Sequence, residues 1–450
     1  MSLAFLYYFG GYMNNSNQSR NAEKSEEIRV RAALVGISGM GISEEECESS
    51  LSELERLLDT AGGECVVKLT QAKDSYDVRT CIGSGKVQTL KESCEFCGVE
   101  LVVFDVDLTP SQIRNLEKIL DGPEVIDRSM LILDIFASHA KSKEGKLQVE
   151  LAQLKYTAPR LIGKGKEMSR LGAGIGSRGP GESQLETDKR HLQRRIYSLE
   201  QQLKEIEKNR QTMRVARDKK GIFKIAIVGY TNAGKSTLMN ALTDADVLAE
   251  NKLFATLDPT TRRYTLPCGE EVLISDTVGF IKRLPHHLVN AFKSTLDETL
   301  YADLILNIVD SSDPECLSEL ECTETTLEEL GAGGKDTIYV FNKKDLPSES
   351  IAFAHVKDMK VVSISAKEGK GIDTLISEIE KTFLNGKKRV VFTFPLSSQS
   401  DVSRLYSFCT VESVEYEADC VKVTATADEK CRGMFAKYLD EKDRPICEEE

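Results

Sequence analysis

Apolar runs alternate with amphipathic stretches through residues 29–140. The continuous apolar runs predict strands at Val30–Ile37, Cys65–Leu69 and Val99–Val106, and apolar positions at helical spacing predict helices at Glu44–Leu58 and Pro110–Leu120. Strands that alternate with helices are typical of an α/β domain with a largely parallel sheet. We therefore predict a small α/β domain at residues 29–140.

Residues 141–220 carry two sets of apolar residues at helical spacing, separated by a gap. The first set is Leu147, Leu151 and Leu154, and the second is Leu185, Leu192, Ile196, Leu199, Leu203 and Ile206. Narrow apolar seams of this kind predict two long helices packed antiparallel as a hairpin. The residues between them, 161–183, are rich in glycine and basic side chains, which predicts a long basic loop at the hairpin tip.

A second α/β pattern covers residues 221–385, the length of one nucleotide-binding domain. Its strands are expected at Phe223–Val228, Tyr264–Leu266, Glu271–Ser275, Leu304–Val309, Thr337–Phe341 and Val361–Ile364. Residues 387–450 follow as a small C-terminal α+β domain, with strands near Arg389–Phe394 and on either side of residues 416–419, and a helix from about residue 428 to residue 439. The fold class predicted for the whole chain is multi-domain α/β.

Charge is distributed unevenly along the 450 residues. The net charge is −13, yet residues 151–220 hold 17 Lys and Arg against 8 Asp and Glu. A basic segment in an acidic protein can contact a polyanion locally while the remainder is repelled, so a positioned contact with nucleic acid is expected at the hairpin. A solvated helix face with extra lysines remains the alternative.

Residues 1–28 begin with an apolar stretch, but no basic residue precedes it and no small-residue cleavage pattern follows it. We expect a disordered extension there instead of a signal peptide. No run approaches the roughly eighteen apolar residues that a membrane span needs, so no span is expected. Twelve cysteines scattered through a charged chain indicate reduced thiols and a cytoplasmic location.

Two short motifs resemble sites but lack a part of them. Cys94 and Cys97 form a C-x-x-C pair with no second pair or His cluster near it, which favours buried thiols over a zinc site. The stretch Ile82-Gly-Ser-Gly-Lys86 lacks the leading glycine of a phosphate loop, which favours a tight turn.

A complete phosphate-loop pattern follows the apolar run Phe223–Val228. Its members are Gly229, Tyr230, Thr231, Asn232, Ala233, Gly234, Lys235 and Ser236, and a helix-like stretch comes next. Backbone N–H groups of such a loop surround phosphates, and the helix N-terminus favours the anion. Lys235 is expected to reach the β- and γ-phosphates, and the Ser236 hydroxyl to hold Mg²⁺. The alternative is a strand-to-helix turn that needs glycine only for its geometry.

Three later motifs follow predicted strands in the order of a GTP-binding domain. They are Asp276-Thr277-Val278-Gly279, Asn342-Lys343-Lys344-Asp345 and Ser365-Ala366-Lys367. Asp276 can hold Mg²⁺ through water, and the Gly279 N–H can face the γ-phosphate. Asp345 can accept from the two donors of guanine, which adenine lacks. These motifs predict a Ras-like P-loop GTPase domain that binds GTP or GDP.

Residues 253–262 stand at the position of the first switch, so Phe254, Ala255, Thr256, Leu257 and Asp258 are expected near the nucleotide. One threonine hydroxyl there normally completes the coordination of Mg²⁺. The residues alone do not choose among Thr256, Thr260 and Thr261.

Four segments together resemble the HflX family of ribosome-associated GTPases. They are Gly229–Thr237, Leu253–Asp258, Asp276–Phe280 and, most particular, Arg178-Gly-Pro-Gly-Glu182 before the long helix. The resemblance covers roughly residues 29–385. It implies Thr256 as a second Mg²⁺ ligand beside Ser236, and a catalytic set of Lys235, Thr256 and Gly279. Residues 1–28 and the C-terminal domain depart from the shared pattern.

The resemblance also implies a partner and a process. The large ribosomal subunit would be bound, with the Gly-rich tip directed toward its RNA, and stalled ribosomes would be split under stress. An assembly factor without splitting activity and an RNA remodeller acting through the N-terminal domain remain alternatives. A monomer is expected for the free protein.

Phe280 stands where Ras-like hydrolases place a water-positioning glutamine. A phenyl ring cannot orient water, so intrinsic hydrolysis is expected to be slow until another group arranges it. His286 and His287 lie nearby in the sequence but are expected to be exposed loop residues.

Overall fold

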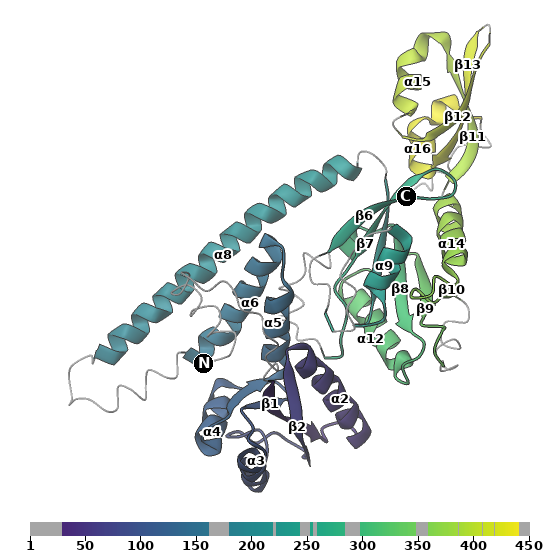
Figure 1. Ribbon diagram of the computed structural model, residues 1–450. Helices are drawn as coiled ribbons and strands as arrows, with labels where there is room; N and C mark the ends of the chain where they lie inside the picture. Colours follow the sequence, from purple (N-terminus) through teal and green to yellow (C-terminus); the bar gives the residue numbers. More distant parts are fainter. Residues whose placement is uncertain are drawn as a thin grey trace, which may run out of the picture.

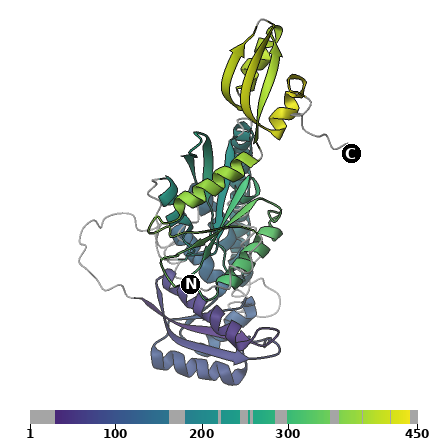
Figure 2. The same cartoon turned by 90° about the vertical axis from the view of Figure 1, so that its right-hand side faces the viewer.

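The structure is a computed structural model that describes residues 29–161, 180–218, 222–243, 253–254, 259–283, 298–347, 359–385, 387–406, 408–417 and 419–440. Its described parts form an N-terminal α/β domain, a helical hairpin, a second α/β domain and a small C-terminal domain (Figure 1). Figure 2 shows the second α/β domain between the N-terminal and the C-terminal domains. The predicted fold class is confirmed.

The N-terminal domain contains a parallel sheet of four strands in the order β2-β1-β3-β4, made of β1 (Val30–Ser38), β2 (Gly63–Ala72), β3 (Leu101–Phe104) and β4 (Glu124–Asp127). Helices α2 (Glu44–Thr60) and α5 (Arg128–His139) cover one face, and α3 (Ser84–Cys97) and α4 (Pro110–Leu120) cover the other. The tight turn predicted at residues 82–86 instead begins α3, with Gly83 as its N-cap. Strand β4 and helices α3 and α5 were not predicted.

The hairpin consists of α6 (Lys143–Leu161) and the 39-residue α8 (Pro180–Asp218). Ion pairs from Glu144 to Arg210 and from Lys155 to Glu200, each 2.7 Å long, set an antiparallel register, as predicted. Helix α8 begins at Pro180, inside the segment predicted as loop, because proline suits the first turn of a helix. It also continues to Asp218, twelve residues beyond Ile206, the last apolar residue of the predicted seam.

The hairpin is anchored on the N-terminal domain beside α5 (Figure 1). The Tyr156 hydroxyl of α6 donates to Asp127 Oδ2 at 2.6 Å. Asp127 also caps α5, since its Oδ1 accepts the Met130 N–H at 3.0 Å. The start of α5 and the tip-proximal end of α6 therefore share one carboxylate.

The second α/β domain has a sheet of six strands in the order β10-β9-β8-β5-β7-β6. The strands are β5 (Phe223–Gly229), β6 (Thr260–Thr265), β7 (Glu271–Asp276), β8 (Leu304–Asp310), β9 (Thr337–Asn342) and β10 (Lys360–Ser363). Only β6 runs antiparallel to its neighbour. The described helices around the sheet include α9 (Lys235–Thr243), α12 (Cys316–Glu329) and α14 (Ile372–Asn385). Each predicted strand is present, with ends shifted by a few residues.

The C-terminal domain follows α14 as an antiparallel sheet in the order β11-β13-β12, formed by β11 (Lys387–Pro395), β12 (Thr410–Tyr416) and β13 (Cys420–Asp428). One face packs on α15 (Gln399–Leu405) and α16 (Glu429–Met434) around Phe392, Phe394 and Phe435. The single helix predicted at residues 428–439 is wrong, because α16 ends at Met434 and a separate 3₁₀ turn follows at Ala436–Tyr438.

Candidate nucleotide site

The phosphate-loop sequence forms a tight turn between β5 and α9. Its main chain is left-handed at Asn232 (φ 61°) and at Gly234 (φ 96°). A Cβ at Gly234 would lie 2.2 Å from Asn342 Nδ2, so only glycine fits this approach of two segments. The turn directs backbone N–H groups and the start of α9 toward one point, which is the arrangement that binds anions.

Lys235 is the first residue of α9, and its side chain is buried within the loop. Its ammonium donates to the Tyr230 carbonyl at 2.6 Å. Burial lowers the pKa of Lys235 to about 8, against the opposing attraction of Asp276 and Glu319. A buried cation held among main-chain groups is suited to an anionic ligand, because a phosphate would offset the cost of its desolvation.

Ser236 and Asp276 bring two oxygen ligands together beside Lys235. The Ser236 hydroxyl donates to Asp276 Oδ2 at 2.8 Å, and Asp276 is fully buried at the end of β7. Thr277, the next residue, donates from its hydroxyl to the Ile227 carbonyl at 2.7 Å and so holds this strand end against β5. A hydroxyl and a carboxylate at one point fit Mg²⁺, which prefers hard oxygen ligands.

Gly279 packs directly on the phosphate loop. A Cβ at this position would lie 2.8 Å from Lys235 Nζ and 2.9 Å from Thr231 Cα. The Thr231 N–H donates to the Phe280 carbonyl at 2.8 Å, and the Phe280 N–H donates to the Gly229 carbonyl at 3.1 Å. Val278 is buried in the core behind this contact. The structure thus joins the phosphate loop to the segment that follows β7.

The two motifs predicted to bind guanine meet at Asn342. Its amide nitrogen donates to the Ala233 carbonyl at 2.8 Å, and its amide oxygen accepts the Ala366 N–H at 2.9 Å. Asn342 therefore fixes three segments: the phosphate loop, the end of β9 and the loop after β10. Lys343 is held by an ion pair of 2.5 Å to Asp310, and the Lys344 N–H donates to the Ile364 carbonyl at 3.0 Å.

Asp345 lies exposed at the mouth of this arrangement. The Ser365 hydroxyl donates to Asp345 Oδ1 at 2.6 Å, and this hydrogen bond lowers the pKa of Asp345. Lys367 lies on the exposed turn after Ser365, and its positive charge adds a smaller lowering effect. The carboxylate is thus ionised and oriented by Ser365, as acceptance of two guanine donors requires.

The first-switch residues contribute less to the described site. Phe254 is buried, and its ring packs edge-on against Phe136 of α5 with the centroids 4.6 Å apart. Its side chain therefore serves the contact between domains, and only its main chain could face a nucleotide. Ala255, Thr256, Leu257 and Asp258 lie outside the described residues, as do His286 and His287.

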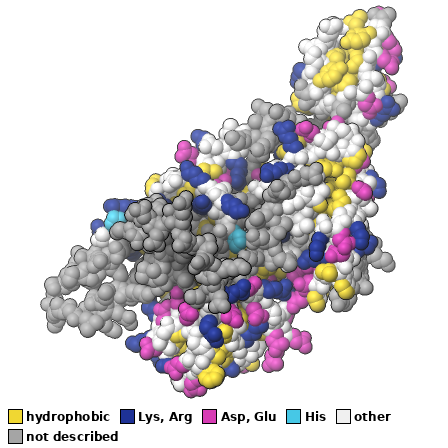
Figure 3. Space-filling view, in the orientation of Figure 1, with side chains coloured by type: hydrophobic (Ala, Val, Ile, Leu, Met, Phe, Trp, Pro, Cys, Tyr) yellow, Lys and Arg dark blue, Asp and Glu magenta, His cyan; other side chains and the backbone are white. Residues whose placement is uncertain are grey.

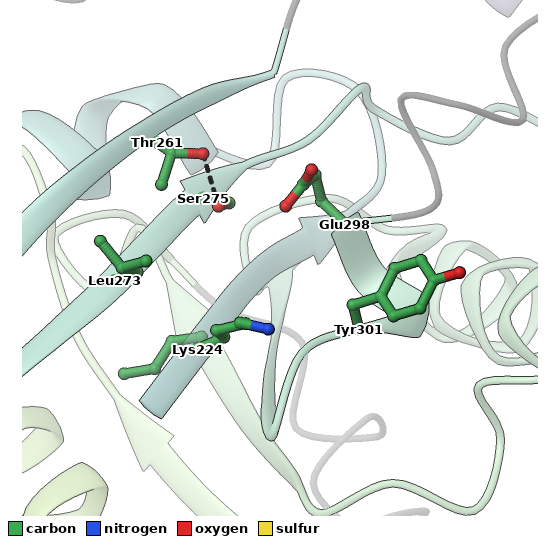
Figure 4. Close-up of a pocket in the computed structure, with 7 residues that line it drawn as sticks. Lys224, Thr261, Leu273, Ser275, Glu298 and Tyr301 are labelled. Atoms are coloured by element: carbon green, nitrogen blue, oxygen red, sulfur yellow. Dashed lines mark hydrogen bonds between the residues drawn. The ribbon is translucent and has the colours of Figure 1, made fainter. Parts of the chain in front are cut away.

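Thr261 is engaged elsewhere, in the pairing of β6 with β7. Its hydroxyl lies 2.9 Å from the Ser275 hydroxyl, beside a small cavity of about 20 Å³ lined also by Lys224, Leu273, Glu298 and Tyr301 (Figure 4). That volume holds about one water molecule, so the cavity is too small for a nucleotide. Thr260 lies opposite Asp276 in the same pairing.

The side chain of Phe280 is buried in an apolar core that also contains Tyr230 of the phosphate loop. The ring is 2% exposed and belongs to a continuous apolar core that also contains residues of α2 and α5. The residue at this position therefore packs between domains. Sequence reasoning missed the polar contacts of this interface, which join residues more than 150 positions apart.

Three protein-family models match successive parts of the chain. They are described as GTP-binding GTPase N-terminal (residues 48–137), GTP-binding GTPase Middle Region (residues 139–217) and 50S ribosome-binding GTPase (residues 224–343). GTPase HflX of Lacrimispora saccharolytica is 44% identical over 418 residues, which is 93% of this chain and 97% of that protein. The chain belongs to the HflX family of GTPases. GTPase HflX of Caldanaerobacter subterraneus subsp. tengcongensis is 47% identical over 90% of this chain and 92% of that protein.

A solved GTP-binding protein of Sulfolobus solfataricus in complex with GDP is 27% identical, with a TM-score of 0.43 over 78% of this chain and 98% of that one. As a member of the HflX family, the chain is a GTP hydrolase with a P-loop.

Among the described residues, no helix combines the length and the apolar character that a membrane span needs. The same residues hold no group of three or more His, Cys, Asp or Glu side chains placed to bind a metal.

Proposed function

We propose that this HflX family GTPase binds the large ribosomal subunit and that its nucleotide state controls this association, with the splitting of stalled or stressed ribosomes as the result. The observation that carries the proposal is the match of residues 224–343 to the family described as 50S ribosome-binding GTPase. The geometry of the site supports nucleotide binding, on which such control depends, because Asn342 ties the guanine motifs to the phosphate loop.

The proposed site assigns roles within the nucleotide loop. Lys235 stabilises the phosphates, Gly279 faces the γ-phosphate, and Asp345 with Ser365 selects guanine. Ser236 and Thr256 would hold Mg²⁺, with Asp276 behind Ser236. The ion would neutralise charge on the phosphates during hydrolysis. The contact of 2.8 Å between Ser236 and Asp276 supports this assignment.

The hairpin is proposed to carry the contact with ribosomal RNA. At 1.5 Å per residue, α8 spans roughly 60 Å and leads to the Gly-rich basic segment, of which residues 162–179 lie outside the described residues. Its exposed cations support an RNA contact; they include Lys189, Arg190, Arg194, Lys204 and Lys208. On the face drawn in Figure 3, acidic side chains gather over the N-terminal domain. The protein is proposed to act in the cytoplasm as a monomer.

Sedimentation with ribosomes tests the proposal. Intact ribosomes and isolated large subunits are each mixed with the protein and GDP, GTP or a non-hydrolysable GTP analogue. We expect binding to large subunits with the analogue, release with GDP, and loss of intact ribosomes when GTP is present. The Asp345→Asn variant serves as the control for guanine dependence. Equal binding to large subunits with GDP and with the analogue contradicts the proposal. Binding without loss of intact ribosomes favours an assembly factor.

A further inference from the structure

A buried charged cluster lies where the N-terminal domain meets the GTPase domain. Arg128, the first residue of α5, is 3% exposed. Its guanidinium donates to Asp105 Oδ1 at 2.9 Å and to the carboxylate of Glu53 on α2. Both carboxylates are buried. Buried charges persist only where they are paired and hydrogen-bonded, so this cluster has a fixed geometry.

The same guanidinium reaches the segment that follows Gly279. Arg128 Nη2 donates to the Lys282 carbonyl at 3.0 Å. The neighbouring Arg283 forms an ion pair of 3.4 Å with Asp105 Oδ2. Lys282 also pairs through its side chain with Glu315. One cation of the N-terminal domain thus holds the main chain of residues 279–283, which we call the second switch region.

Tyr230 completes the connection from the phosphate loop. Its buried hydroxyl donates to the Glu53 carboxylate and accepts the Lys282 N–H at 2.8 Å. Burial and the charge of Glu53 raise the pKa of Tyr230, so the hydroxyl remains a donor. Both main-chain polar groups of Lys282 are therefore bound, one through Tyr230 and Glu53 and the other by Arg128.

The segment between these anchors includes Gly279 and Phe280. The Phe280 N–H and carbonyl are bonded to Gly229 and Thr231, and Gly279 packs on Lys235 and Thr231. Residues 279–282 are thus fixed at one end by the phosphate loop and at the other by the N-terminal domain. A misplacement of about 1 Å in a reacting assembly can cost about 10²-fold in rate.

We propose that Glu53 and Arg128, two residues of the N-terminal domain, are positioning residues for GTP hydrolysis, acting through the main chain of Lys282. They set the place of Gly279 against the phosphate loop, while no hydrogen bond or ion pair of the described residues joins them to the loops proposed to bind guanine. Their loss is therefore expected to lower the rate of the chemical step and to leave the affinity for GDP unchanged.

Single-turnover hydrolysis and GDP titration of the full-length protein separate these two effects. Arg128→Met and Glu53→Gln should reduce the single-turnover rate about 10- to 100-fold, with the GDP dissociation constant within about twofold of the wild type. Tyr230→Phe, which removes only the hydroxyl, should also slow hydrolysis. Arg29→Met is the matched control, because Arg29 forms an exposed ion pair of 2.8 Å with Asp59 on the same domain and its loss should change neither quantity.

Hydrogen exchange provides a second readout at the proposed contact. Amides of residues 279–283 should exchange faster in Arg128→Met and not in Arg29→Met. Should Arg128→Met fail to bind one GDP per chain, Arg128→Lys replaces it, because an ammonium cannot span Asp105, Glu53 and the Lys282 carbonyl together. Hydrolysis at or above the wild-type rate overturns the proposal. So does a loss of GDP affinity that parallels the loss of rate.

Discussion

The side chain of Asn342 joins the Ala233 carbonyl, 2.8 Å away, to the Ala366 N–H, 2.9 Å away. One buried amide therefore sets the distance between the proposed phosphate and guanine contacts. A bound nucleotide must reach the phosphate contacts and the guanine contacts at the same time. The affinity for the nucleotide therefore depends on the Asn342 amide even if that amide does not touch the nucleotide.

Replacing Asn342 with Ala should weaken nucleotide binding. Each buried partner left without its hydrogen bond costs about 1–3 kcal/mol, so the dissociation constant for GDP should rise at least about tenfold. Titration with a fluorescent GDP derivative measures this change. Asn115→Ala is the control, because Asn115 lies on α4 of the N-terminal domain and donates to the Arg79 carbonyl there. An unchanged affinity in Asn342→Ala would show that the three segments are held in place without it.

Asp345→Asn should shift preference from GTP toward xanthosine triphosphate, because xanthine carries a carbonyl where guanine carries its amino group and an amide can donate to it. Ser365→Ala should weaken GTP binding by a smaller factor, since it removes only the hydrogen bond of 2.6 Å that orients the carboxylate. Competition binding with the two nucleotides checks both variants. Equal GTP affinity in the wild type and Asp345→Asn contradicts the guanine assignment.

Gly279→Ala should slow hydrolysis strongly while GDP still binds. The new methyl group would lie 2.8 Å from Lys235 Nζ and 2.9 Å from Thr231 Cα, so residue 279 must move away from the phosphate loop. We expect a loss of about 10²-fold or more in the single-turnover rate. Gly334→Ala is the matched control, because a Cβ at Gly334 meets nothing within 4 Å. A Gly279→Ala variant that hydrolyses GTP normally would exclude a need for this close contact.

Glu319 should make stability depend on pH. Burial on α12, with smaller contributions from Asp313 and Asp310, raises the pKa of Glu319 from 4.5 to about 8. The folded protein therefore keeps a proton that the unfolded chain releases above about pH 4.5, so the free energy of unfolding falls as pH rises toward about 8. The loss is on the order of 2 kcal/mol between about pH 6 and pH 8.

The Glu319→Gln variant has no such proton, so its thermal midpoint relative to the wild type should rise over the same pH range. Melting curves of both proteins across the range measure the difference. A difference that stays constant with pH would mean that Glu319 titrates near its ordinary pKa.

Neutralising Lys164, Lys166, Arg170 and Arg178 together should weaken ribosome binding and flatten its salt dependence, because fewer phosphate contacts release fewer counterions. Affinity for GTP in free solution should stay constant. Sedimentation with large subunits over a range of salt concentrations provides the measurement. If the variant binds large subunits like the wild type at every salt concentration, the tip is a linker that does not contact ribosomal RNA.

Local patterns made much of this molecule predictable, and long-range contacts account for the rest. Each nucleotide motif is a short continuous stretch of sequence that follows a predicted strand. The meeting of Lys235, Ser236 and Asp276 could therefore be expected from the order of the strands alone. Helix α5 could not, because it is apolar on nearly every side and shows no amphipathic period. The bond from Tyr230 to Glu53 spans 177 positions, and neither residue has a pattern that indicates the other.

The hydrogen bond between Tyr156 and Asp127 has a mechanical consequence. Asp127 directly precedes Arg128, so the residue that receives the Tyr156 hydroxyl of α6 and the residue that holds the Lys282 carbonyl are neighbours in the chain. The hairpin and the second switch region are therefore linked like the two arms of a lever that pivots at the start of α5. Force applied at the far end of α8 would arrive there as a small rotation, and GTP turnover would respond to load as well as to chemistry.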